Sequence, residues 1–133
     1  MSVLVDTCVW SSALQRRDNP DSPVKRELIR LIEEFQAKII GPIRQELLSG
    51  IPDSKQFEVL KTRLQAFPDI PILSRDYEVA AGMHNACRRK GIQGSHIDFL
   101  MCSVAVQHGL KIFTLDLDYR QFAEIIDIKL HEP

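Results

Sequence analysis

Four acidic residues stand where this chain could perform chemistry. Asp6 and Asp116 each follow a short apolar run typical of a buried strand, and Glu46 and Asp98 each lie in the first turns of an apolar helix. In a parallel α/β sheet these positions meet at the edge where strands end and helices begin, which is where open α/β sheets place their sites. Carboxylates gathered there repel one another, so they require raised pKa values or a cation. Hard oxygen ligands without Cys or His predict Mg²⁺ or Mn²⁺.

Each of these acids also has an ordinary structural explanation. Asp6 can cap the helix after the first strand, and Glu46 suits the positive end of a helix dipole. Asp98 forms a capping-box pattern with Ser95, although Glu or Gln is the usual residue at that position. Four separate caps that converge on one sheet edge are nevertheless less expected than one site. We therefore interpret the four acids together.

The identity of the fourth acid is open between two neighbours. Asp116 and Asp118 both follow the apolar run 111–115, and one of them is expected to cap the short helix that comes next. We favour Asp118 as the cap and Asp116 as the functional acid.

The elements that must position these acids alternate along the chain. Apolar runs predict strands at 2–6, 37–40, 70–73 and 111–115, with 127–131 as the candidate for a fifth. Helices are predicted at 7–14, from Pro23 onward, and at 41–50, 53–64, 74–90, 95–108 and 119–125. Their predicted N-caps include Ser22, Asp53, Ser74 and Ser95. Helical crossovers imply a parallel sheet with helices on both faces. The sequence thus predicts a single α/β domain over 1–133, a three-layer α/β/α fold with a central, mainly parallel sheet of four to five strands.

Composition limits the classes of protein to consider. The chain has 133 residues, of which 26% are charged, and a net charge of −1, so it has no global field that would attract nucleic acid. Three cysteines without paired spacing indicate free thiols in a reducing cytosol, and the His84 and Cys87 pair is too small for a zinc site. The first residues do not resemble a signal peptide, and the longest apolar stretch, 99–106, is too short to span a bilayer. We expect a cytoplasmic protein with no membrane association.

The order and spacing of these residues carry a family resemblance over the whole chain. The sequence resembles PIN domains, and among them the small VapC-type toxins of toxin–antitoxin pairs. The segments that carry the resemblance are VDTCVW (5–10), RQELLSG (44–50), DFLMCSVA (98–105) and TLDLDY (114–119). The chain departs from the usual pattern at Cys8, at 101–103 and at Tyr119, and none of these positions is an acid.

The resemblance implies a PIN-like fold and a metal-dependent endoribonuclease that uses Mg²⁺ or Mn²⁺. In such an enzyme Asp6 would bind the main ion, Asp98 and Asp116 would complete its shell, and Glu46 would hold a second ion or orient the water. Secondary roles fall to four further residues: Thr7 and Thr114 would orient Asp6 and Asp116, Asp118 is the alternative fourth acid, and Arg44 could reach a phosphate or pair with an acid.

The resemblance also implies partners. They are an RNA substrate, a VapB-like antitoxin that blocks the acidic pocket with an inserted arginine, and a second copy in a homodimer. Candidate RNA contacts are local basic patches and two aromatic side chains as candidates for stacking on a base: Arg16 and Arg17; Lys25, Arg26 and Arg30; Arg88, Arg89 and Lys90; Trp10 and Tyr119. For each patch a solvated helix face is the stronger explanation, and for Trp10 a place in the core is.

Three other functions were compared with this one. A phosphoacceptor receiver domain needs an adjacent pair of acids after the first strand, whereas Asp6 is followed by Thr7. A phosphatase of the haloacid dehalogenase type carries its DxD near the start of a larger chain, whereas Asp116 and Asp118 come late. The serious alternative is a catalytically inactive PIN-like module that acts through a protein or RNA partner.

Overall fold

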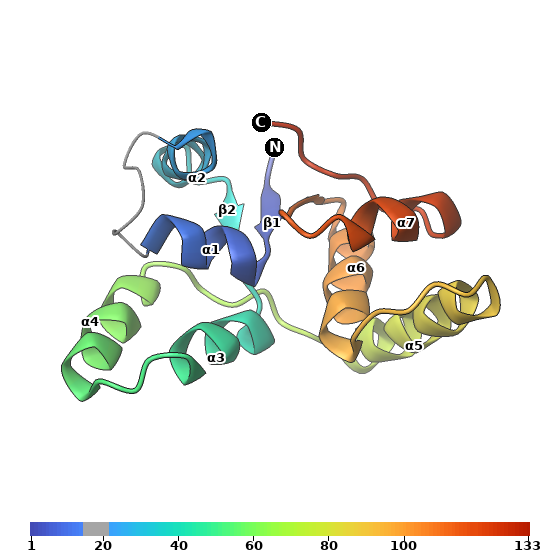
Figure 1. The fold of residues 1–133 in the computed structure, drawn as a ribbon, viewed down its shortest axis with the longest axis horizontal. Coiled ribbons are helices and arrows are strands. Elements are labelled where there is room, and N and C mark those ends of the chain that lie inside the picture. Colours follow the sequence, from blue (N-terminus) through green and yellow to red (C-terminus); the bar gives the residue numbers. More distant parts are fainter. Residues whose placement is uncertain (15–21) are drawn as a thin grey trace.

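The protein has a small parallel sheet between two groups of helices. The computed structural model describes residues 1–14 and 22–133. In it β1 (Val3–Val5) pairs in parallel with β2 (Ala37–Lys38) on one side and with β3 (Lys111–Phe113) on the other. Helices α1 to α4 lie to one side of the strands and α5 to α7 to the other (Figure 1). The helices are α1 (Thr7–Leu14), α2 (Pro23–Glu33), α3 (Gly41–Ser49), α4 (Ser54–Leu64), α5 (Ser74–Arg89), α6 (His96–His108) and α7 (Asp118–Ile125). The predicted α/β class is confirmed.

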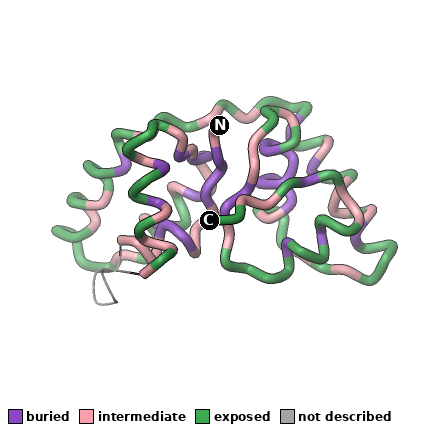
Figure 2. The backbone as a smooth tube through the Cα atoms, turned by 90° about the horizontal axis from the view of Figure 1, so that it is seen from above, coloured by how far each residue is buried: buried purple, intermediate pink, exposed green. Residues whose placement is uncertain are grey.

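The central strand is apolar on both faces because helices cover both. Val3, Leu4 and Val5 are each at most 2% exposed, and buried residues gather around this strand in the middle of the molecule (Figure 2). A strand that is buried on both faces has no polar positions to alternate with, which explains the continuous apolar run. The buried strand β1 therefore fixes the backbone position of Asp6, which follows it directly.

The number of strands was predicted wrongly: residues 1–14 and 22–133 form three, not four or five. At the segment predicted as 70–73, a single bridge joins Ile39 with Asp69, one residue earlier, and Ile70 N donates to Ile39 O at 3.0 Å. Pro71 follows at once and has no N–H to continue the ladder. The segment 127–131 likewise makes one bridge, Ile112 with Leu130, with hydrogen bonds from Ile112 N to Lys129 O and from His131 N to Ile112 O.

The strand predicted at 111–115 ends at Phe113, two residues early. Beyond it the backbone N–H groups bind side chains and no longer continue the sheet: Leu115 N donates to Cys8 Sγ at 3.3 Å, and Asp116 N donates to Thr114 Oγ1 at 3.0 Å. The strand therefore stops where the residues of the candidate site begin.

Three helix starts follow the predicted caps. The side chains of Ser22, Asp53 and Ser95 each accept a hydrogen bond from the backbone N–H three residues onward, as their types predict. Ser74 was predicted as the cap of α5, but Leu73 occupies that position. Asp76 supplies the missing acceptor, because its carboxylate binds Leu73 N at 2.9 Å.

Two of the basic patches predicted as RNA contacts can be compared with the structure in different ways. Arg16 and Arg17 lie outside the described residues. In the predicted patch on α2, Arg30 binds Glu27 at 2.8 Å and Glu34 at 2.9 Å, so neighbouring carboxylates compensate its charge.

In the described part of the chain, no helix is both long and apolar enough to cross a membrane.

Helix α2 ends in an unusual way. After the cap residue Glu34, the N–H of Phe35 donates to Ile32 O at 3.0 Å and the N–H of Gln36 donates to Leu31 O at 2.8 Å, which is the Schellman pattern. That pattern places Phe35 in the left-handed region at φ 58°, where glycine is favoured. The phenyl ring is also 87% exposed, so little packing offsets this strain.

Replacing Phe35 with glycine should therefore stabilise the fold. The left-handed conformation costs an L residue roughly 1–2 kcal/mol, partly offset by the greater chain entropy that glycine loses on folding, so Phe35→Gly should raise the free energy of unfolding by about 1 kcal/mol. Equilibrium unfolding in urea measures this change. The matched control is Glu33→Gly, two residues earlier in ordinary helical backbone, which should lower stability by about 0.5–1 kcal/mol. If both changes shift stability in the same direction, the strain argument is wrong.

Candidate active site

The carboxylate of Asp6 is held by three donors at the end of β1. Oδ1 accepts a hydrogen bond from the backbone N–H of Thr7 at 2.8 Å, and Oδ2 accepts one from Thr114 Oγ1 at 2.8 Å. Cys8 Sγ also lies 3.6 Å from Oδ2 and accepts from Leu115 N at 3.3 Å. Cys8 was noted in the sequence only as a departure from the family pattern. Its spacing two residues after Asp6, at the start of a helix, was the signal that could have placed it in the site.

Asp6 is electrostatically strained. Burial raises the pKa of this carboxyl above its usual range, the bonds from Thr114, Thr7 and Cys8 lower it in part, and the negative charge of Asp98 raises it again. The last effect places Asp6 and Asp98 within range of each other's charge. A desolvated acid beside another acid is typical of functional sites, because the arrangement gains from binding a cation or a proton.

Thr114 joins the ends of β1 and β3. Its hydroxyl donates to Asp6 and accepts from the backbone N–H of Asp116, so one side chain sets the position of both acids. Its hydroxyl binds the carboxylate of Asp6 but only the backbone N–H of Asp116, so its predicted role in orienting the Asp116 carboxylate stays a prediction. The prediction that Asp118 caps α7 was wrong: Leu117 occupies the cap position, and the carboxylate of Asp116 accepts from Asp118 N at 2.9 Å. Asp116 and Asp118 are both exposed.

Glu46 reaches the same region from α3. Its Oε2 accepts a hydrogen bond from Thr7 Oγ1 at 3.2 Å, and Thr7 is the residue whose N–H holds Asp6. Thr7 therefore contacts two of the four acids, Asp6 through its backbone and Glu46 through its side chain. Glu46 itself is exposed.

Asp98 has both of its oxygens occupied. Oδ2 accepts from Ser95 N at 2.9 Å while Ser95 Oγ accepts from Asp98 N at 3.0 Å, so the capping box is formed. Oδ1 accepts from the hydroxyl of Tyr119 at 3.1 Å. Base stacking by Tyr119 is ruled out because the side chain is fully buried, and Trp10 is buried too, with Nε1 donating to Val5 O at 3.1 Å. Burial and the charges of Asp6 and Asp98 raise the pKa of Tyr119, so its hydroxyl stays protonated and remains a donor.

Arg44 pairs with an acid, but not with one of the four. Its Nε lies 2.9 Å from Asp69 Oδ1, and its two terminal nitrogens donate to the carbonyl oxygens of Leu64 and Phe67. These contacts hold the segment after α4 against α3. The guanidinium is thus committed to structure, which leaves its predicted reach toward a phosphate without support.

The donors present suit a hard cation that keeps much of its own water. Among residues 1–14 and 22–133, no three His, Cys, Asp or Glu side chains converge closely enough to enclose a metal ion by themselves. Mg²⁺ is usually bound by one or two carboxylates together with water and substrate phosphates, and it does not need an all-protein cage. Asp6 and Asp98 supply two such carboxylates. Because an ionised carboxylate has about four lone-pair sites, their hydrogen bonds still leave acceptor capacity for a cation.

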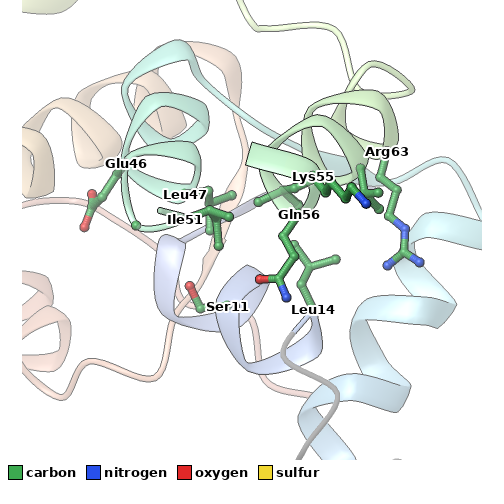
Figure 3. A pocket seen from close by; sticks show the side chains of 11 residues that line it. Ser11, Leu14, Glu46, Leu47, Ile51, Lys55, Gln56 and Arg63 are labelled. Atoms are coloured by element: carbon green, nitrogen blue, oxygen red, sulfur yellow. The ribbon is translucent and has the colours of Figure 1, made fainter. Parts of the chain in front are cut away.

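A groove lies next to Glu46, between α1, α3 and α4. Its volume is about 740 Å³, and Figure 3 shows Glu46 at one end and Arg63 at the other. Apolar side chains, among them Leu47 and Val59, form much of its lining, and Lys55 and Arg63 add positive charge. A surface of this kind suits an apolar partner segment that also carries negative charge.

Comparison with known proteins now identifies the family. The sequence pattern of the PIN domain matches residues 3–125. The chain belongs to the PIN domain family. Ribonuclease VapC11 of Mycobacterium tuberculosis is a PIN-type relative, 30% identical over 131 residues that cover 96% of each chain.

Solved structures show the same PIN fold. FitAcB from Neisseria gonorrhoeae superposes with a TM-score of 0.80 at 24% identity, over 98% of this chain and 97% of that one. A toxin–antitoxin complex from Klebsiella pneumoniae gives a TM-score of 0.68 at 21% identity, over 96% and 95% of the two chains. At these identities the comparison establishes the PIN fold, and the chemistry must be argued from the residues.

The strain at Asp6 predicts that removing its charge stabilises the protein. Because the folded-state pKa is raised, the stability linked to protonated Asp6 is complete below the ordinary aspartate range and is lost as pH rises through the raised value. At neutral pH the ionised form therefore costs stability. Asp6→Asn should raise the Tm at pH 7 in EDTA, and the gain should shrink as pH falls toward 4.

The control is Asp127→Asn, which removes the same charge from an exposed position after α7 and should leave the Tm nearly unchanged. Differential scanning calorimetry measures both variants. A lower Tm for Asp6→Asn than for the wild type at pH 7 would show that the lost hydrogen bonds outweigh the relieved charge.

Proposed function

We propose that this PIN domain is a metal-dependent endoribonuclease, the toxin of a VapBC-like pair, and that it acts on RNA in the cytoplasm. The observation that carries the proposal is the strained carboxylate of Asp6, desolvated and within range of the charge of Asp98 at the carboxyl edge of the sheet. A buried acid beside a second carboxylate gains from binding a cation. The relative named ribonuclease VapC11, which matches over nearly the whole chain, supports RNA as the substrate.

Asp6 and Asp98 would hold a Mg²⁺ or Mn²⁺ ion, with Asp116 and Glu46 reaching it through water. When bound, the ion supplies an activated water and neutralises charge on the phosphate. The protein's own part is to keep the acids oriented. Thr114 fixes Asp6 and Asp116 together, and Oε1 of Glu46, which accepts no hydrogen bond from Thr7, is available to orient a water or take its proton. Asp118 is the less suited fourth acid, because it is the first residue of α7 and only its backbone N–H binds Asp116.

The rival proposal, an inactive binding module, differs in one measurable respect. Purified protein with Mn²⁺ or Mg²⁺ should cleave RNA, and Asp6→Asn should cleave at least about 100-fold more slowly, since a metal ion contributes several kcal/mol to stabilising the transition state. Asp127→Asn should match the wild type. The products should carry 5′-phosphate and 3′-hydroxyl ends, because the attacking group is water and not the ribose 2′-hydroxyl.

Two results would count against the enzyme. Equal cleavage by the wild type and by Asp6→Asn would point to a contaminating nuclease and leave the binding module as the better explanation. Ends with 2′,3′-cyclic phosphates would contradict attack by water. Mapping the ends of cleaved cellular RNA after brief expression also identifies the substrate.

We propose that the groove beside Glu46 is the binding site of the antitoxin. Its apolar lining and its two basic side chains suit an amphipathic segment with acidic residues, and a partner in the groove would lie next to the acids it must block. The structure of the toxin–antitoxin complex from Klebsiella pneumoniae, which shares the fold, supports such a partner. The inserted arginine and the homodimer stay predictions from the family resemblance.

Val59 offers a test of this groove because it is 54% exposed, so its replacement should not disturb the core. Val59→Asp should weaken binding of the cognate antitoxin at least about tenfold, since a buried valine contributes roughly 1.5 kcal/mol or more. Calorimetric titration measures this, with Ile29→Asp on α2, 41% exposed and outside the groove, as the control. Unchanged antitoxin binding together with lost RNA cleavage would instead assign the groove to RNA.

A further inference from the structure

The hydroxyl of Tyr119 has no role in packing the core, although the ring of this residue does. The ring is fully buried at the start of α7 and packs against Phe122, with ring centroids 5.2 Å apart at 61°. Phenylalanine would fill the same space. The oxygen instead reaches Oδ1 of Asp98, which lies on a different helix. Burying a hydroxyl costs free energy unless it is hydrogen-bonded, so this contact accounts for the tyrosine.

Asp98 depends on two anchors to fix the plane of its carboxylate. The terminal torsion of an aspartate side chain is broad and has no sharp staggered minimum, so packing preference alone does not set it. The bond from Ser95 N to Oδ2 fixes one oxygen. The bond from Tyr119 to Oδ1 fixes the other. Without the second bond the carboxylate can swing about the first.

Both anchors lie beside one aromatic cluster, formed by Tyr119, Phe122 and Phe99. Phe122 contacts Phe99 with ring centroids 4.8 Å apart, and Phe99 is the residue after Asp98. The loop that leads to Ser95 passes close to these rings at Gly94, where a Cβ atom would lie only 2.6 Å from Phe122 and 2.9 Å from Phe99. Packing therefore fixes the positions of the tyrosine ring and of the loop relative to Asp98.

We propose that Tyr119 is a positioning residue, whose hydroxyl holds the Asp98 carboxylate in the orientation that receives the divalent ion. This role rests on the proposed metal-dependent function, and it makes Tyr119 a residue that raises the affinity of the site for the ion. Tyr119 has no contact of its own with substrate, since it is fully buried. Its effect must pass through Asp98, in the way that partners of metal-binding carboxylates generally act.

The test compares Mn²⁺ binding by the wild type and by Tyr119→Phe, followed through the electron paramagnetic resonance signal of free Mn²⁺. The variant keeps the ring and loses only the hydroxyl. We expect its dissociation constant for Mn²⁺ to rise about 10-fold or more, the usual effect of losing such a partner. In cleavage assays the variant should need correspondingly more Mn²⁺ and recover most of the maximal rate at saturation. The matched control, Tyr77→Phe, makes the same change at an exposed position on α5 and should behave as the wild type.

Each other outcome has a definite meaning. Equal Mn²⁺ affinity in the wild type and Tyr119→Phe would overturn the positioning role while leaving the nuclease proposal intact. A lower Tm and a lower maximal rate at unchanged Mn²⁺ affinity would show that the hydroxyl only supports packing, and would also overturn it. If the wild type binds no Mn²⁺ and cleaves no RNA, the proposed function fails and this inference fails with it.

Discussion

The hydrogen bond from Thr114 to Asp6 is the contact on which the candidate site depends. It joins the ends of β1 and β3, two neighbouring strands that are 108 residues apart in the chain. The same hydroxyl accepts from the N–H of Asp116, so the turn after β3 is built around it. The sheet ends where this contact begins, because N–H groups that would extend the ladder bind Thr114 and Cys8 instead. Strand length and site geometry are therefore set by the same few atoms.

Opposing interactions act on the acids of the site. Burial and mutual repulsion disfavour the charge on Asp6, while the donors around it hold the carboxylate in place. Glu46 and Asp116 are exposed to solvent. The result is a graded arrangement, with constrained acids at the centre and solvated acids at the rim. An arrangement of this kind can bind a hydrated ion without a closed cage, since water and phosphate supply the remaining ligands.

Sequence patterns predicted the parts of this structure that depend on local rules. The β1 run, the caps at Ser22, Asp53 and Ser95, and the parallel order of strands follow from apolar periodicity, capping chemistry and crossover length. The strand count failed because edge pairing depends on single contacts, such as the one that Pro71 interrupts. The roles of Cys8 and Tyr119 were missed for a related reason. Cys8 binds Leu115 N and Tyr119 binds Asp98 across tertiary contacts that the local sequence does not reveal. For Cys8 the position two residues after Asp6 was the one local signal.

The sheet order has a consequence for when the site can exist. β1 is the central strand and the first to be synthesised, yet the groups that orient Asp6 and Asp98 include Thr114 and Tyr119, far along the chain. Domains fold as units during synthesis, and contacts between distant residues wait for the later one. Asp6 therefore leaves the ribosome long before its partners. The hydrogen bonds that orient Asp6 and Asp98 can therefore form only after Thr114 and Tyr119 have been made, the first of them 108 residues after Asp6.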